Sequence, residues 1–487
     1  MASCWLPVAS VVIVGLAALF SGLLSRDRFD GCCPVLNWEQ RHAFDSPVVL
    51  RPSSLAEVVA AVNMARLQRK RLTIVGSGHS YSSIAVPNPD VGGTADDMEM
   101  HNNGSVLVCM RCYSGLVRVD SDSHLVTVLA GTSLEQLISI LDQHRLALDV
   151  MPTVFEPTIG GIVAAGSHGC GTKHSSVASL VREIELVTPD GEVVTASPEK
   201  NPDIFYGATV GLGSLGVLTK VTLQTGPAYN LAERSSVMHL TELAGNFEHI
   251  VTESEYVKIL VEYHTGAVQI ISSNRTHEQP RNSPTRLEAD FWAYVIEAFQ
   301  FSTMLYPAII PATMRFLIHH LRVFSPSERV ETWSKALSIQ QYIPLHLESE
   351  FAVPLAQTPQ AIEAVYKLVD EIGIGISVFN EVRCASGDKF WLSNGYGATP
   401  RCHVTLGLYG QDNRKAEYFG QVGQRLMALG AEPRPHWAKF YTLTERQLST
   451  LYPKWGDFVA LKRKLDPNAM FCNAYLQQVF SESKVCG

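Results

Sequence analysis

Several titratable residues stand among apolar neighbours, in combinations that could do chemistry on an oxygen-rich ligand. Glu381 and Arg383 are two residues apart in "NEVR", so on a strand their side chains point to the same side. An acid beside a guanidinium can hold a hydroxylated ring and polarise one of its oxygens; a plain ion pair is the alternative interpretation. Lys439 closes the apolar run "HWAK", where a buried ammonium is costly unless it serves an anion. His436 of the same run is a further candidate base, or a ring that only packs.

A second chemical signal is an imidazole in a glycine turn. In "RLTIVGSGHSYSS", residues 71–83, a strand-like run ends at Gly76 and Gly78, and His79 and Ser80 follow directly. Consecutive backbone N–H groups in such a turn form a nest for anions, and the missing Cβ atoms let a ligand approach. The turn lacks the complete GxGxxG spacing of the dinucleotide fingerprint. It therefore indicates a phosphate-bearing ligand; a polar turn residue is the alternative interpretation of His79.

Two more glycine-rich loops carry hydroxyl or imidazole side chains. The loop "TIGGIVAAGSHGCGTKHSS", residues 158–176, surrounds Ser167 and His168 with glycines, and "GLGSLGV" occupies residues 211–217. Three such loops in one region predict a large, extended ligand that lies along the backbone. Three independent tight turns would explain the glycines but not the serines.

The elements that must position these loops alternate between strands and helices from residue 44 to residue 228. Strands are predicted at "SPVVLRP", "RLTIVGSG", "HLVTVLAG" and "GVLTKVTLQT", and capped helices at residues 54–70 and 133–146, where apolar residues recur at helical spacing. The run "LVREIELVTPDGEVVTA" predicts a hairpin around Pro189-Asp190-Gly191. Residues 230–440 mix strand-like runs with helices such as "TPQAIEAVYKLVDEI", and residues 441–487 form a return segment.

The order "VGSGHS … TIGGIVAAGSHGCG … GLGSLGVLTKVTL" resembles the FAD-binding (PCMH-type) domain of the vanillyl-alcohol-oxidase superfamily. The segments "FNEVRCASGD", "RPHWAKFY" and "LKRKLDPNAMFCNAYLQQVF" extend this to a resemblance to the aldonolactone oxidase family over residues 37–480. The resemblance implies an α+β fold, with a PCMH-type FAD-binding domain of two α/β subdomains and a cap domain whose antiparallel sheet is flanked by helices. The implied divisions are 1–28 (hydrophobic anchor or signal), 40–228 (FAD-binding domain), 229–440 (cap, or substrate, domain) and 441–487 (return segment on the FAD-binding domain).

The same resemblance implies roles for individual residues. His79 would carry FAD through a covalent bond to the 8α-methyl group of the flavin. Lys439 would place a positive charge near the N1–O2 edge of the flavin, with Glu381, Arg383 and His436 around the substrate. The other cofactor contacts would come from the three glycine loops: Gly76, Ser77, Gly78, Ser80, Gly161, Ser167, Gly169 and Val217.

The implied activity is FAD-dependent oxidation of a sugar-derived lactone of the D-arabinono-1,4-lactone or L-gulono-1,4-lactone type. Hydride would pass from the substrate alcohol carbon to flavin N5, and the electrons to O2 to give H2O2, as in ascorbate-type biosynthesis. An alditol oxidase, and a lactone dehydrogenase with a protein electron acceptor, are alternatives that use the same residues. A flavin-free membrane protein that uses the fold as a binding scaffold is the alternative from a different class.

Composition and hydropathy bear on partners and location. The formal net charge of −8 gives no basic field for nucleic acid. Residues 5–24 form an uncharged run of bilayer-spanning length. They predict an uncleaved N-terminal anchor in the endoplasmic reticulum or another endomembrane, with a cleaved signal peptide and secretion as the alternative. Residues 291–324 are apolar but interrupted by prolines and charges, and predict either an interfacial hairpin or a pair of core helices.

The ten cysteines leave the redox compartment open. Cys32 and Cys33 are adjacent, and Cys109 and Cys112 form "CMRC". A single CxxC without a second pair is a weak metal signal, so no metal site is predicted. Ordinary thiols or one local disulfide are expected instead.

Overall fold

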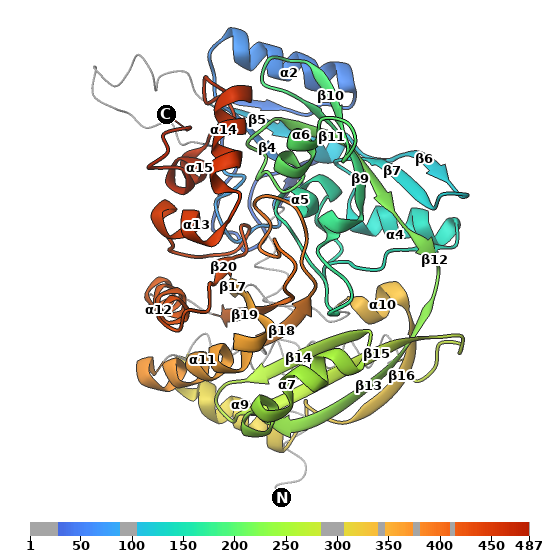
Figure 1. Cartoon of the computed structure of the whole chain (residues 1–487), viewed down its shortest axis with the longest axis vertical. Helices are drawn as coiled ribbons and strands as arrows, with labels where there is room; N and C mark the ends of the chain where they lie inside the picture. Colours follow the sequence, from blue (N-terminus) through green and yellow to red (C-terminus); the bar gives the residue numbers. More distant parts are fainter. Residues whose placement is uncertain are drawn as a thin grey trace, which may run out of the picture.

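The computed structural model describes residues 28–87, 105–283, 306–338, 346–373, 380–409 and 414–486. Figure 1 shows two stacked parts. The early segments, blue to teal, and the final segment, red, form the upper part, and the middle of the chain, green to orange, forms the lower part around one large sheet. The chain thus returns to its first part at its end.

A small parallel sheet carries the first glycine turn. Ser54 caps the helix that precedes β4 by accepting a hydrogen bond from the backbone N–H of Glu57, and Val58 and Val62 pack from this helix into the core below the sheet. Because β4 ends at Val75, the glycine turn lies at the carboxyl edge of the sheet. The order is β3-β5-β4, with β3 (Val48–Leu50), α2 (Leu55–Leu67), β4 (Leu72–Val75) and β5 (Val106–Cys109).

An antiparallel sheet of five strands forms the second subdomain, in the order β10-β9-β11-β7-β6. The predicted hairpin is present, since Val187 of β9 pairs with Val193 of β10 across the Pro-Asp-Gly turn. Ser133 and Gln136 close a capping box at the start of α4. The elements are β6 (Leu116–Asp120), β7 (Leu125–Leu129), α4 (Leu134–Gln143), α5 (Ile159–Ala164), β9 (Val181–Val187), β10 (Val193–Ala196), α6 (Pro202–Ala208) and β11 (Val217–Gln224).

The lower part is an antiparallel sheet of eight strands, in the order β16-β13-β15-β14-β18-β19-β17-β20. Its apolar positions, among them Phe351, Val382 and Val404, are buried in the main core with residues of the helices that flank the sheet. The strands are β13 (Asn230–His239), β14 (Tyr256–Glu262), β15 (Ala267–Thr276), β16 (Ser327–Thr332), β17 (His346–Pro354), β18 (Asn380–Ala385), β19 (Arg401–Tyr409) and β20 (Arg434–Pro435). The helices are α7 (Leu240–Glu253), α9 (Ile310–His319), α10 (Trp333–Leu337), α11 (Thr358–Ile372) and α12 (Lys415–Ala428).

The last helices pack on the first sheet (Figure 1). The backbone N–H of Leu72 donates to the carbonyl of Met470 over 2.8 Å. Asn473 caps α15 and donates through Nδ2 to the carbonyls of Ile84 and Val86. These helices are α13 (Glu445–Leu451), α14 (Trp455–Leu465) and α15 (Ala474–Val479); the short strand pairs are β1 (Phe29–Asp30) with β2 (Cys33–Pro34), and β8 (Leu146–Ala147) with β12 (Gly226–Pro227).

The predicted fold class is confirmed by this architecture: two small α/β subdomains and an antiparallel sheet flanked by helices. The strands and helices expected before residue 228 all form. These strands and helices could be predicted because helix caps and apolar periodicity specify them within a few residues, without distant contacts.

Four disulfides correct the expectation of thiols or one local bridge. The bond between Cys384 and Cys402 joins residues that pair directly on neighbouring strands, with Cα atoms 3.8 Å apart. Partners that lie up to 80 residues apart cannot be matched from spacing alone. Four disulfides are typical of proteins that fold in an oxidising compartment. The pairs are Cys32–Cys112, Cys33–Cys109, Cys384–Cys402 and Cys472–Cys486.

The predicted membrane location is also corrected. Within the described ranges, no helix is both long enough and apolar enough to span a bilayer. The described helix of the predicted interfacial segment, α9, has ten residues and buries Ile310, Met314 and Leu317 in a small apolar cluster, which matches the core-helix alternative. Residues 5–24 and 291–305, on which the rest of that prediction depended, lie outside the described residues.

Candidate active site

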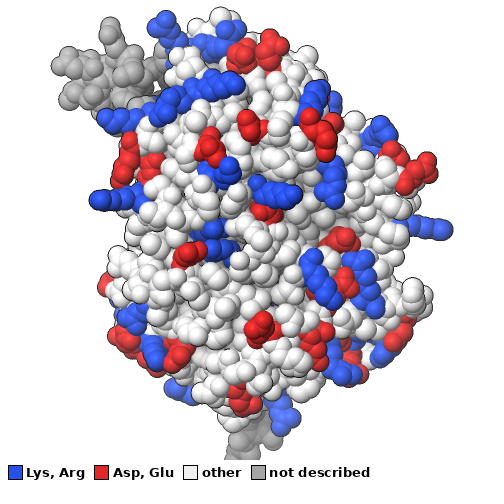
Figure 2. Space-filling view, in the orientation of Figure 1, with Lys and Arg blue, Asp and Glu red and all other residues white. Residues whose placement is uncertain are grey.

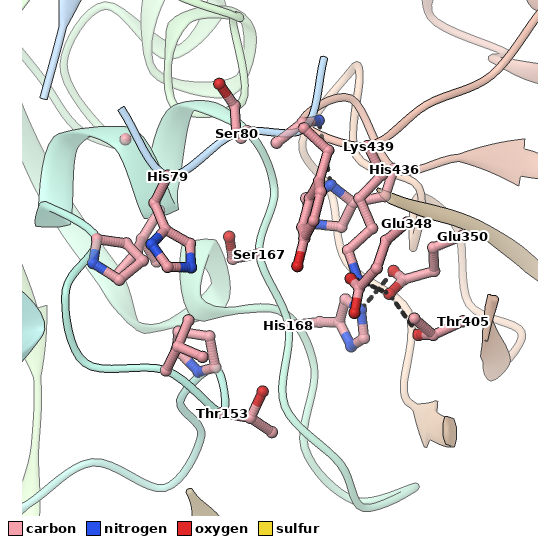
Figure 3. Close-up of a pocket in the computed structure, with 18 of the residues that line it drawn as sticks. His79, Ser80, Thr153, Ser167, His168, Glu348, Glu350, Thr405, His436 and Lys439 are labelled. Carbon is pink, nitrogen blue, oxygen red and sulfur yellow. Dashed lines mark hydrogen bonds and ion pairs between the residues drawn. The ribbon is translucent and has the colours of Figure 1, made fainter. Parts of the chain in front are cut away.

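A cavity of roughly 740 Å³ lies between the glycine turn and the large sheet. One side is formed by the turn after β4 and the loops around α5, and the other by residues of β17, β18 and the segment after β20. Figure 3 shows His79 on one side of this space and Glu348, Glu350 and Lys439 on the other. The loops expected to bind a cofactor therefore face the residues expected to bind a substrate.

The glycine turn has the shape of a cradle. A Cβ atom on Gly76 would lie 2.1 Å from Oγ1 of Thr158, so only glycine lets the two loops approach this closely. Gly78 has a φ of +65°, in the left-handed region that favours glycine. The buried hydroxyl of Ser80 has no hydrogen-bond partner among the described residues. These features fit the FAD that the sequence implies, because the backbone is open to it and a hydroxyl remains for it.

His79 projects from this turn into the cavity wall. Its side chain is only 10% exposed, and its Nδ1 atom lies 3.0 Å from Oε2 of Glu156. The ring also packs against Trp38, with centroids 5.3 Å apart. Burial lowers the pKa of His79, although Glu156 opposes this effect. The imidazole is therefore neutral at pH 7 and keeps a nitrogen lone pair.

The opposite wall is one face of the eight-stranded sheet. Glu381 and Arg383 of β18 are two residues apart, and so are Glu348 and Glu350 of β17, which places each pair on one side of its strand. The register then joins the strands: Arg383 pairs with His403, and Glu350 with Thr405. The polar face alternates with the buried apolar positions of the same strands, so the sheet separates the core from the site.

Glu350 is the centre of the polar cluster. Its carboxylate, fully buried, accepts hydrogen bonds from Thr405 over 2.8 Å and from Lys439 over 2.9 Å, and its other oxygen lies 2.7 Å from Nε2 of His168. Burial alone would raise the pKa of Glu350, but Lys439 and His168 hold it well below its usual value. Glu350 is therefore ionised and joins loops from both parts of the molecule (Figure 3).

Lys439 is paired more strongly than the sequence suggested. Its ammonium lies 2.6 Å from Oε2 of Glu348 and 2.9 Å from Oε2 of Glu350. Burial favours the neutral amine, but the two carboxylates outweigh it and raise the pKa of Lys439. The cation thus stays charged inside the protein because two protein anions hold it, while its side chain still lines the cavity.

Glu381 and Arg383 are both an ion pair and part of the cavity wall. Their charged atoms lie 3.0 Å apart, and both residues line the cavity. Arg383 also lies 3.9 Å from Glu350 and is almost fully buried. The ion pair therefore does not exclude contact with a ligand, and the substrate-binding role of the two residues stays a prediction.

His436 is a neutral imidazole whose Nδ1 lone pair already has a partner. Its Nδ1 atom accepts a hydrogen bond from the backbone N–H of Ala438 over 3.2 Å. Burial lowers the pKa of His436 to about 4, so the ring is neutral and its single proton stays on Nε2. His436 can therefore donate to a ligand in the cavity through Nε2, while its Nδ1 lone pair is occupied by Ala438; a role as a base stays a prediction.

The remaining predicted residues divide into two groups. Gly161 and Ser167 line the cavity with the glycine turn. Gly169 and Val217 are not among the lining residues; the side chain of Val217 lies in the apolar core under the parallel sheet. The sequence reading missed five residues of the polar cluster. The run "HLESE" carried a usable signal, since its titratable residues recur at every second position; the missed residues are His168, Glu348, Glu350, His403 and Thr405.

Surface charge gives no further indication of a partner. Figure 2 shows basic and acidic side chains interspersed over the face of Figure 1, without a continuous area of one sign.

The sequence is similar to those of known proteins. A family model described as "D-arabinono-1,4-lactone oxidase" matches residues 221–479, and one described as "FAD binding domain" matches residues 46–197. The L-gulonolactone oxidase of Mus musculus is 29% identical over 456 residues, covering 91% of this chain and 97% of that protein. The L-gulono-1,4-lactone dehydrogenase of Mycobacterium tuberculosis is 26% identical, covering 91% of this chain and 98% of that protein.

A solved structure agrees on the fold. Cholesterol oxidase from Brevibacterium sterolicum superimposes with a TM-score of 0.74 at 17% identity, covering 93% of this chain and 99% of that chain. At this identity the likeness concerns the architecture only. The first glycine turn and two residues of α5 in the cavity wall, Gly160 and Gly161, lie inside the matched FAD-binding domain. The polar face of the sheet lies inside the matched 221–479 region.

Proposed function

Because the chain belongs to the D-arabinono-1,4-lactone oxidase family, we propose that it is an FAD-dependent oxidase of a sugar-derived lactone of the D-arabinono-1,4-lactone or L-gulono-1,4-lactone type. When bound, FAD takes up hydride from the alcohol carbon of the substrate. One observation carries the proposal: the cradle around His79 and the polar face with Arg383 and Lys439 line a single cavity. A cofactor in the cradle and a polyhydroxylated ring on the sheet would therefore meet.

Arg383 and Glu381 bind and orient the substrate in this proposal. The guanidinium is held by Glu381 at 3.0 Å and presents its remaining N–H groups to a ring or carbonyl oxygen. The carboxylate of Glu381, 12% exposed, accepts a hydrogen bond from a substrate hydroxyl group. His436 donates through Nε2 to a further substrate oxygen, because its Nδ1 atom is already an acceptor.

Lys439 supplies a fixed positive charge at the cavity wall. Charge that develops during the oxidation is stabilised most by groups that need no reorganisation. Two carboxylates at 2.6 and 2.9 Å fix the ammonium in place, so its position does not depend on the ligand. The role of Lys439 is thus electrostatic rather than acid–base.

His79 carries the FAD covalently in this proposal. Support comes from its place in the cradle, its 10% exposure and its neutral ring, which retains a lone pair for bond formation. The cofactor should therefore remain on the denatured polypeptide. A fluorescent band on a denaturing gel supports the bond, and a dark band with free FAD in the acid supernatant contradicts it. His79→Ala is the matched variant, expected to bind FAD only reversibly.

A substrate panel tests the activity itself. L-gulono-, L-galactono- and D-arabinono-1,4-lactone are compared with xylitol and sorbitol, with peroxide as the readout. The proposal expects turnover of at least one lactone above the alditols; preference for an alditol would make the protein an alditol oxidase. The electron acceptor is tested separately by mixing the reduced enzyme with air. Slow reoxidation with fast transfer to a protein or dye acceptor would identify a dehydrogenase, and absence of bound flavin would reject both enzymes.

A further inference from the structure

The imidazole of His168 has two hydrogen-bond partners, and both are acceptors. Its Nδ1 atom lies 2.9 Å from the carbonyl oxygen of Gly169, and its Nε2 atom lies 2.7 Å from Oε1 of Glu350. The ring is 2% exposed and the carboxylate 1% exposed, so water cannot replace either partner. His168 is not a residue to which the sequence reading gave a role.

The number of protons decides how well these contacts are satisfied. A backbone carbonyl only accepts, and an ionised carboxylate only accepts. With one proton on the ring and Glu350 ionised, one of the two contacts cannot be a hydrogen bond. If the proton is on Nε2, the lone pair of Nδ1 faces the carbonyl oxygen of Gly169, and if it is on Nδ1, the lone pair of Nε2 faces the carboxylate oxygen of Glu350. With two protons on the ring, both contacts become hydrogen bonds, and the contact to Glu350 becomes charge-assisted. Burial and the neighbouring His403 hold the pKa of His168 well below its usual value, and the carboxylate of Glu350 opposes this; it is the two acceptor contacts that call for a second proton.

We propose that His168 is held as an imidazolium by Glu350, and that this pair sets the charge of the cavity wall. This inference rests on the proposed function, in which charge develops in the cavity. The charged groups clustered around Glu350 are three carboxylates and two cations, which leaves one negative charge unbalanced. An imidazolium makes this cluster neutral; Lys258 also lines the cavity but donates to the carbonyl of Ala336 instead. The groups that face one another here are Glu348, Glu350, Glu381, Arg383 and Lys439.

The neighbouring ring of His403 fits this assignment. It stacks on His168 with centroids 3.4 Å apart and planes inclined by 14°. Two imidazolium rings at this distance would repel, whereas a cation over a neutral ring is attracted. Burial lowers the pKa of His403, and its Nδ1 atom, 3.4 Å from Glu350, makes no hydrogen bond. Burial lowers the pKa of both rings, so the contacts distinguish them: only His168 makes a hydrogen bond to Glu350, and we therefore assign the charge to His168 and the neutral ring to His403.

Two substitutions in the holoenzyme distinguish the imidazolium from a neutral ring. His168→Gln removes a positive charge if the proposal holds, and the equilibrium constant for two-electron reduction of the bound flavin should fall about tenfold. That is the effect of one charge over roughly 10 Å at an effective dielectric constant of about 20, and it equals about 30 mV in midpoint potential. Glu350→Gln removes the carboxylate and with it the second proton on His168. The net charge should therefore be unchanged, and the equilibrium constant for flavin reduction should stay within about threefold of that of the wild type.

A neutral His168 predicts the reverse pattern. His168→Gln would then leave the midpoint potential unchanged, and Glu350→Gln would raise the equilibrium constant for flavin reduction about tenfold, or the potential by about 30 mV, which would overturn the proposal. His174→Gln is the matched control, because His174 pairs with Glu255 at 3.1 Å and does not line the cavity. Its potential should equal that of the wild type.

Nuclear magnetic resonance on the full chain tests the same proton without relying on either variant's reduction. Protein labelled with ¹⁵N in the histidine rings should show one ring that keeps both nitrogens protonated up to pH 8, where exposed histidines are neutral, and this signal should be missing in His168→Gln. A His168 ring with one bare nitrogen between pH 6 and 8 would reject the imidazolium. Because this measurement does not require turnover, the protonation of His168 can still be determined if the proposed lactone oxidation fails.

Discussion

Replacing Lys439 with methionine is the most informative single perturbation of this site. The substitution keeps the length of the side chain and removes an ammonium that lies 2.6 Å from Glu348 and 2.9 Å from Glu350. Two buried carboxylates would then lose their shared cation. Breaking a buried ion pair by removing one partner typically costs about 3–5 kcal/mol, so we expect the free energy of unfolding at pH 7 to fall by this amount.

The rate of flavin reduction should fall as well. Removing one preorganised electrostatic group commonly slows a reaction by about 10²–10³, and we expect a loss of this size in anaerobic stopped-flow reduction by the substrate. The affinity of the flavin for sulfite should fall in parallel, because the adduct also leaves negative charge on the flavin.

The stability loss of this variant should depend on pH. In the wild type, Lys439 and His346 hold the pKa of Glu348 well below its usual value despite burial, so this contribution is present above the unfolded pKa and is lost as pH falls. Without Lys439, burial of the Glu348 carboxylate is no longer offset by the ammonium. Protonation at acid pH then relieves the variant of this buried charge. The difference in unfolding free energy between the two proteins should therefore shrink between pH 6 and pH 4.

A matched control separates stability from catalysis. Lys462 of α14 is fully buried and pairs with Asp466, the residue that follows this helix; neither residue lines the cavity. Lys462→Met should lose comparable stability and keep the reduction rate. If Lys439→Met reduces within about threefold of the wild-type rate and keeps its sulfite affinity, then Lys439 only packs, and Arg383 is the cation of the site.

Three further predictions concern other parts of the molecule. Gly76→Ala should yield protein largely without bound FAD, measured by the ratio of flavin to protein absorbance, because a Cβ there would lie 2.1 Å from Oγ1 of Thr158; full flavin content would refute the close approach of the two loops. The double variant Cys384→Ala/Cys402→Ala opens a disulfide with a sequence separation of 18 and should lose about 3 kcal/mol of unfolding free energy in denaturant titrations. Because burial lowers the pKa of His436 to about 4, protonation opposes the fold. Wild-type stability should therefore fall more steeply than that of His436→Gln as pH drops from about 6.5 to 4, and parallel pH profiles would contradict this.

Local patterns in the sequence were sufficient for the elements and for part of the site. The spacing of two between Glu381 and Arg383 placed both side chains on one face of β18, because successive residues of a strand point to opposite faces. The glycine turn at Gly76 and Gly78 was visible because it follows a strand directly. These features involve residues within one strand or turn, and the chain needs no distant contact to specify them.

The charge state of the site was decided by the tertiary structure. Glu350 meets His168, which lies 182 residues away in sequence, and Lys439, 89 residues away. Such encounters depend on strand order and register, which no local pattern contains. The lone pair of His436 was likewise used by the backbone N–H of Ala438, a contact set by the loop conformation after β20.

The sequence by itself therefore determined which residue types stand on which strand face and in which turn, since periodicity and turn chemistry act over a few residues. Only the tertiary structure decided which of those groups are charged, donating or already paired. A buried group's protonation depends on the few partners within about 3–4 Å, because the interior screens charge weakly and offers no water as a substitute. Those partners come from segments that meet only after the eight-stranded sheet has closed against the glycine loops.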